Sequence, residues 1–137
     1  MKKWKLIPEP YPTEHQEQVG LLRWAWYKSA TIPELTLLYA IPNGGRRDAI
    51  TGAQLKAEGV KRGVPDLCLP VARGAYHGLY IELKRRVSGV VSEHQQQWIE
   101  QLRSQGYKAE VAHGASEAIQ IIEQYLNLKP IFERKAS

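Results

Sequence analysis

Apolar residues recur along most of this chain with the period of either an α-helix or a β-strand. Helical spacing predicts helices over residues 14–29, 51–58, 93–105 and 116–126. Short apolar runs predict strands over residues 35–41, 66–69, 79–83 and 107–112. Helices and strands therefore mix along the chain, which predicts an α/β fold with a central mixed β-sheet flanked by helices.

Two helix starts carry a capping-box signature, a Ser or Thr followed three residues later by Gln. Thr13 with Gln16 opens the first predicted helix, and Ser92 with Gln95 opens the third. The first helix has more apolar surface than one buried face needs, so the surplus fits either the core or a partner surface. The large aromatic residues Trp24, Trp26 and Trp98 are expected in the core.

Length and composition favour one domain. The chain has 137 residues, close to the usual size of a single domain. We expect an irregular arm over residues 1–12, a folded domain over 13–128 and a polar tail over 129–137. The N-terminus lacks the apolar run of a signal peptide, so a cytoplasmic location is expected. The single cysteine, Cys68, excludes an intrachain disulfide and a cysteine-rich zinc site.

Charge points to a polyanionic partner. The formal net charge is +5 and the sequence pI is about 9.4. Basic proteins bind nucleic acids partly because neutralising phosphates releases counterions. Charge alone does not separate a nucleic-acid-binding protein from other basic proteins.

The strand predicted over 79–83 runs into the strongest candidate chemistry. Side chains alternate across a strand, so Glu82 and Lys84 share one face, about 7 Å apart along it. Asp66 follows a proline at the start of another predicted strand. If the two strands pair, both carboxylates converge on a site that suits Mg²⁺. Lys84 could then hold an attacking water or neutralise developing charge. A Glu-x-Lys pair is also common on solvated strands, so the alternative to a catalytic site is a cluster of ion pairs on the surface.

Several motifs in a fixed order give the chain a family resemblance. Residues 13–126 resemble the VRR-NUC family, the virus-type replication-repair nucleases of the PD-(D/E)xK superfamily, and especially its stand-alone phage and bacterial members. The matching pieces, in order, are Glu14 with Gln18, residues 41–45, residues 55–59, residues 63–67, residues 81–84, and Ser92 with Gln95.

The resemblance implies a restriction-endonuclease-like core and a role for each matched residue. Asp66 and Glu82 would bind Mg²⁺ or Mn²⁺ with help from the Leu83 carbonyl. Lys84 would be the catalytic lysine, and Glu14 would add a carboxylate from the first helix. Glu17 is a rival for the Glu14 role. Gln95 would sit beside the centre, although its place in a capping box explains it almost as well.

Basic residues flank both catalytic segments and are candidate DNA-phosphate contacts. They are Arg46, Arg47, Lys56, Lys61, Arg62, Arg85 and Arg86. Asn43 precedes a Gly-Gly loop, which suits either a tight turn or an approach to phosphate. A solvated charged face is the alternative interpretation of the basic set.

These observations favour a metal-dependent DNA endonuclease. Stand-alone relatives resemble junction resolvases in size, which implies a homodimer acting on branched DNA, with four-way junctions preferred to flaps. One alternative is a non-catalytic module that binds DNA or a replication protein. Another is a flap or restriction-type nuclease with the same centre.

Overall fold

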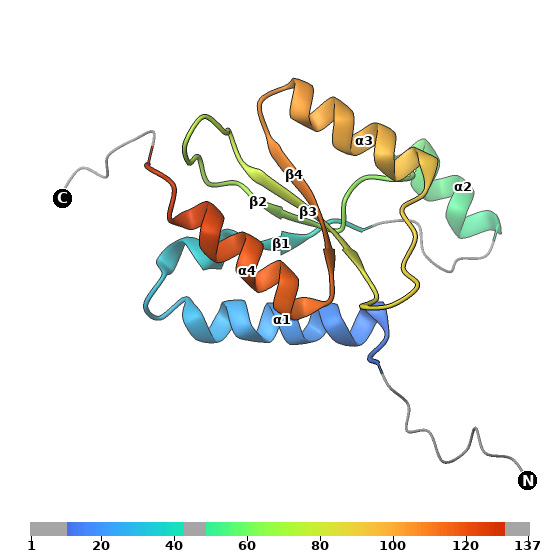
Figure 1. Ribbon diagram of the computed structural model, residues 1–137. Coiled ribbons are helices and arrows are strands. Elements are labelled where there is room, and N and C mark those ends of the chain that lie inside the picture. Colours follow the sequence, from blue (N-terminus) through green and yellow to red (C-terminus); the bar gives the residue numbers. More distant parts are fainter. Residues whose placement is uncertain (1–10, 43–48, 131–137) are drawn as a thin grey trace, which may run out of the picture.

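The computed structural model describes residues 11–42 and 49–130. Its four strands form a mixed sheet with helices on both faces (Figure 1). The elements are α1 (Glu14–Lys28), η2 (Pro33–Leu37), β1 (Tyr39–Ala40), α2 (Ala49–Ala57), β2 (Leu67–Leu69), β3 (Leu79–Lys84), α3 (Glu93–Ser104), β4 (Lys108–His113) and α4 (Ala115–Leu126). The α/β class predicted from the sequence is confirmed. Among the described residues, no helix combines the length and the apolar character that a membrane span requires.

The order of the strands places β3 in the interior of the sheet. The strands lie in the order β1-β2-β3-β4; β1 pairs with β2 and β2 with β3 in antiparallel fashion, while β3 and β4 are parallel. Five of the six residues of β3 are buried, and the sixth, Tyr80, is half-buried. The strand that carries the candidate chemistry is therefore enclosed between β2 and β4.

The main core lies between the sheet and the helices α1 and α4. Leu79, Ile81 and Leu83 of β3 belong to this core, together with Leu21 of α1 and Ile122 of α4. The alternate side chains of β3 must point to the opposite face. That face is covered by α3, so a polar centre built on it is separated from the main core by the sheet itself.

Both predicted capping boxes are present. The Thr13 hydroxyl accepts a hydrogen bond from the Gln16 backbone N–H, and the Gln16 side chain accepts one from the Thr13 N–H. Ser92 and Gln95 make the same pair of bonds at the start of α3. These local signals fix where α1 and α3 begin.

The strand predicted over residues 35–41 is wrong for most of its length. Pro33 opens the 3-10 helix η2, and only Tyr39–Ala40 pair as β1. Ile32, Leu35 and Leu38 turn one face inward, and a spacing of three residues matches the three residues per turn of a 3-10 helix. The apolar run therefore packs as a helical turn before it enters the sheet.

The expected burial of Trp26 is also wrong. Its side chain is 80% exposed, and the adjacent Tyr27 is 76% exposed. The buried face of α1 is defined by Glu17, Leu21 and Ala25, which are spaced four residues apart. Trp26 and Tyr27 follow Ala25 and project away from that face, whereas Trp24 packs partly against the core.

Candidate active site

Strand pairing brings Asp66 and Glu82 together. Leu67 lies opposite Ile81 in the antiparallel register, and continuing this register by one residue places Asp66 opposite Glu82. Asp66 Oδ2 accepts a hydrogen bond of 2.7 Å from the Leu83 backbone N–H. The convergence expected from the sequence, which depended on the pairing of these two strands, is therefore present.

The loop before Asp66 packs tightly on the start of α3. Gly63 has φ of +86°, and a Cβ at this position would lie 2.7 Å from the His94 carbonyl carbon. A side chain at position 63 would be both strained and in collision with the α3 backbone. Glycine therefore permits the close approach that holds the Asp66 loop beside the helix that carries Gln95.

Glu82 is the most enclosed polar group of the centre. It is 2% exposed, and its Oε2 accepts a hydrogen bond of 2.9 Å from Gln95 Nε2. Lys84 Nζ lies 3.6 Å from the same oxygen. Gln95 thus uses its two amide atoms for two purposes, because its Oε1 completes the capping box of α3. Glu82 Oε1 is buried and has no hydrogen-bond partner within the described part of the chain.

The electrostatics of the pair favour an added positive charge. Burial, reinforced by the negative charge of Asp66 and opposed by Lys84, raises the pKa of Glu82 to about 8. Burial also raises the pKa of Asp66, although its hydrogen bond from Leu83 acts in the opposite direction. If both carboxylates were ionised, one lysine would leave them without full charge compensation, and this is part of the reason why Glu82 takes up a proton so readily. A divalent cation would supply that compensation and would give Glu82 Oε1 a partner.

The residues present therefore fit a hard cation that retains much of its own water. The described residues contain no group of three or more His, Cys, Asp or Glu side chains placed to hold a metal ion. Asp66 and Glu82 would be the side-chain ligands, and waters and substrate oxygens would fill the remaining positions. Glu14 is exposed, and the structure does not bring it into a cluster with these two carboxylates. The Leu83 carbonyl stays a predicted ligand.

Comparison with known proteins settles the family. The model of the VRR-NUC domain matches residues 13–116. The chain belongs to the VRR-NUC domain family. A solved structure described as a VRR_NUC domain protein is similar over 87% of this chain and 92% of its own, with 34% sequence identity and a TM-score of 0.75. Among curated proteins, none matches the chain.

Membership makes this a nuclease-type domain of the PD-(D/E)xK superfamily. The candidate residues of the sequence analysis lie together in the fold, with Asp66 directly before β2, and Glu82 and Lys84 on β3. This candidate centre lies on the sheet face that α3 covers.

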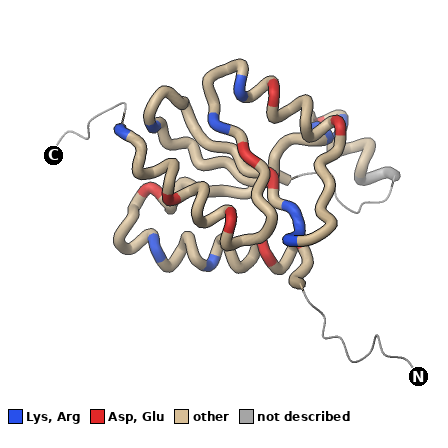
Figure 2. Tube along the Cα trace, in the orientation of Figure 1, with Lys and Arg blue, Asp and Glu red and all other residues tan. Residues whose placement is uncertain are grey.

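The predicted DNA contacts have different environments. Lys56, Lys61, Arg62 and Arg85 are exposed. Figure 2 shows a run of basic positions where β3 leaves the sheet. Asn43, Arg46 and Arg47 lie outside the described residues. Arg86 differs from the others, because its guanidinium donates hydrogen bonds of 2.7 and 3.2 Å to Glu17.

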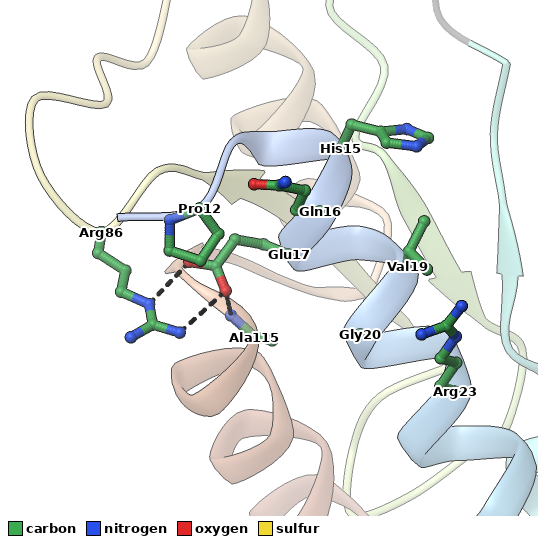
Figure 3. A pocket seen from close by; sticks show the side chains of 9 residues that line it. All are labelled: Pro12, His15, Gln16, Glu17, Val19, Gly20, Arg23, Arg86 and Ala115. Carbon is green, nitrogen blue, oxygen red and sulfur yellow. Dashed lines mark hydrogen bonds and ion pairs between the residues drawn. The ribbon is translucent and has the colours of Figure 1, made fainter. Parts of the chain in front are cut away.

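The sequence did not predict the buried position of Glu17 or its contacts. Glu17 was considered only as a rival to Glu14, yet it is 3% exposed and lies against Arg86 and the start of α4 (Figure 3). An open pocket of about 620 Å³ adjoins it, lined also by His15, Gln16 and Arg23. An acidic residue in the first turn of a helix was the only local signal, and helix-dipole stabilisation explains such a residue equally well.

Proposed function

We propose that this VRR-NUC protein is a metal-dependent DNA endonuclease with Asp66, Glu82 and Lys84 as its catalytic residues. The observation that carries the proposal is the buried Glu82, which faces Asp66 and Lys84 and retains one oxygen without a partner. A purely structural ion cluster would be expected to satisfy all of its buried oxygens. An unsatisfied buried carboxylate oxygen beside a second carboxylate is typical of a cation site.

Each residue has a distinct part in phosphodiester hydrolysis. Bound Mg²⁺ or Mn²⁺ would acidify a water molecule and stabilise negative charge on the scissile phosphate. Asp66 and Glu82 would hold the cation, and Gln95 orients Glu82 through its 2.9 Å hydrogen bond. The Lys84 ammonium, only 3.6 Å from Glu82, is suited to orient the attacking water or to neutralise developing charge.

The substrate we propose is branched DNA, with four-way junctions preferred to flaps. The net charge of +5 and the exposed Lys61, Arg62 and Arg85 support phosphate contacts around the centre. A junction needs two symmetric nicks, which two copies of one chain can supply. The exposed Trp26 and Tyr27 at the end of α1 offer an apolar surface for a second copy.

A panel of labelled substrates tests this proposal. Purified protein is incubated with four-way junctions, flaps and plain duplex in Mg²⁺ or Mn²⁺, next to the Glu82→Ala variant. We expect the junction to be cut fastest, and we expect Glu82→Ala to cut none of the substrates.

Each other result has a defined meaning. Faster cleavage of flaps or of a defined duplex sequence would replace the junction by that substrate. Binding without cleavage in either metal ion would favour the non-catalytic module. Cleavage that survives Glu82→Ala would remove Glu82 from the centre.

A further inference from the structure

Glu17 is a buried carboxylate outside the catalytic pair that joins three segments of the chain. Its Oε2 accepts a 2.7 Å hydrogen bond from Arg86 Nε, and its Oε1 accepts bonds of 3.2 Å from Arg86 Nη2 and from the Ala115 backbone N–H. The hydrogen bonds from Arg86 lower the pKa of Glu17, so the carboxylate is charged at neutral pH. Figure 3 shows Glu17 reaching from α1 to both partners.

Both partners of Glu17 belong to segments that leave the sheet beside Lys84. Arg86 follows Lys84 by two residues, and Ala115 follows His113, the register partner of Lys84 on β4. The Gly114 N–H donates a hydrogen bond of 2.9 Å to the Lys84 carbonyl. Glu17 therefore clamps the two segments directly after the last pair of the β3–β4 ladder, which is the pair that contains the catalytic lysine.

The packing at this point leaves no room for a side chain at position 114. Gly114 has φ of +95°, and a Cβ there would lie 2.8 Å from Arg86 Cγ and 3.1 Å from Glu17 Oε2. Glycine is thus required for the close approach of the β4–α4 turn to the ion pair. Glu17, Arg86 and the Gly114–Ala115 turn therefore pack together as one unit, which we call the node.

Arg86 and its neighbour Arg85 differ in the partners of their side chains. The Arg86 guanidinium is bidentate on the buried Glu17 carboxylate, so much of its charge is compensated by that carboxylate although the Arg86 side chain itself is 45% exposed. Arg85 has an exposed side chain with no hydrogen-bond partner among the described residues, and its backbone carbonyl lies 3.1 Å from His113 Nδ1. Both arginine side chains are exposed, and they differ in that Arg86 is held by the Glu17 carboxylate.

We propose that Glu17 and Arg86 are positioning residues that fix the end of β3, and with it Lys84, relative to the carboxylate pair. This rests on the proposed nuclease function. Arg86 contributes to the rate of the bound complex and not to phosphate binding, whereas Arg85 contributes to phosphate binding.

Arg86→Lys is the most informative variant, because it keeps the charge and loses the bidentate geometry. At saturating DNA we expect its single-turnover cleavage rate to fall by at least about tenfold, as a small misplacement of a catalytic group does. Its metal-free DNA affinity and the salt dependence of that affinity should match the wild-type chain. Arg85→Ala should instead weaken DNA binding and reduce the salt slope by about one.

Amide hydrogen exchange gives a readout that needs no cleavage. In Arg86→Lys and Glu17→Gln, exchange at the Gly114 N–H, which bonds to the Lys84 carbonyl, should accelerate at least about tenfold, because local opening no longer has to break a bidentate ion pair. Exchange at Leu21 in the middle of α1 should not change. Glu123→Gln, at an exposed position on α4, is the control for loss of a carboxylate.

The outcomes separate the positioning role from its alternatives. A saturating rate in Arg86→Lys within threefold of wild type, or unchanged exchange at Gly114, overturns the proposal. A loss of salt slope in Arg86→Ala equal to that in Arg85→Ala also overturns it, because Arg86 would then contact phosphate. If the wild-type chain cuts no DNA, the nuclease function fails, and the exchange experiment still decides whether the node holds the end of β3.

Discussion

The pKa of Glu82 is set by burial, by the charge of Asp66 and by the charge of Lys84, which act in different directions. Burial and the facing Asp66 favour the protonated form of Glu82, and Lys84 favours its ionised form. Gln95 contributes a neutral amide donor, which positions the carboxylate without adding charge. With a pKa of about 8 the Glu82 carboxyl group holds a proton at neutral pH, and a cation bound as we propose would displace it.

Metal affinity should consequently depend on pH. The pKa of Glu82 in the metal-free fold is about 8, above its ordinary value, so below pH 8 a proton competes with the cation. Between pH 6 and 8 we expect Mn²⁺ affinity to rise roughly tenfold per pH unit, and to level off above that range. Calorimetric titration of the metal-free protein measures this. An affinity independent of pH over the same range would show that Glu82 is already ionised.

Variants of Gln95 and Ser92 can separate the two roles of the Gln95 side chain, which caps α3 and also donates a hydrogen bond to Glu82. Ser92→Ala removes the side-chain cap of α3 and should lower the free energy of unfolding by about 1 kcal/mol. Gln95→Ala removes its arm of the same capping box and also the hydrogen bond to Glu82. We expect both variants to lose stability and only Gln95→Ala to lose metal affinity. Equal metal affinities would assign Gln95 to the helix alone. Denaturant unfolding and metal titration measure the two effects.

At the scale of elements, the Asp66 loop and α3 must touch for the centre to form. Gly63→Ala should destabilise the fold by roughly 1 to 3 kcal/mol, because φ is +86° and the new Cβ would meet the His94 backbone. Gly52→Ala is a matched control within α2, where nothing lies within 4 Å of the new Cβ. It should stabilise by about 0.5 to 1 kcal/mol. Thermal unfolding of both variants measures the difference, and equal effects would contradict the tight packing at Gly63.

Elements with strong local signals were predictable from the sequence. Capping boxes marked the starts of α1 and α3, and the spacing of Leu79, Ile81 and Leu83 at every second position identified β3. Residues 35–41 were wrongly predicted as a strand, because a continuous run of apolar residues does not show whether its buried positions recur every two or every three residues. Burial of Ile32, Leu35 and Leu38 against α1 and the sheet decides for the 3-10 turn.

The candidate site divides in the same way. Asp66, Glu82 and Lys84 could be assigned because the short motif and strand alternation place them on one face. Glu17 and Arg86 are 69 residues apart in the chain, and only the folded arrangement of α1 beside the end of β3 brings them into contact. Strand geometry predicts neighbours within an element, whereas contacts between elements depend on the whole fold.

At the scale of the whole molecule, the end of α1 presents a pair of large apolar side chains to solvent. Trp26 and Tyr27 are exposed at the end of α1, and we expect them to contact a second copy of the chain. Light scattering in solution should give twice the chain mass of 15.6 kDa. Joint replacement of Trp26 and Tyr27 by serine should give the mass of one chain. A wild-type monomer at micromolar concentration would contradict the dimer and the symmetric cleavage that depends on it.

The catalytic centre itself is tested most directly by the single-turnover rate of DNA cleavage as the Mg²⁺ or Mn²⁺ concentration is raised. Wild-type protein should cut only when the cation is present, with a rate that saturates. Glu82→Gln, which keeps the shape of the side chain and removes its charge, should reduce the saturated rate by at least about a hundredfold. Cleavage in a chelator, or a Glu82→Gln rate equal to that of the wild-type chain, would contradict a metal centre on Asp66 and Glu82.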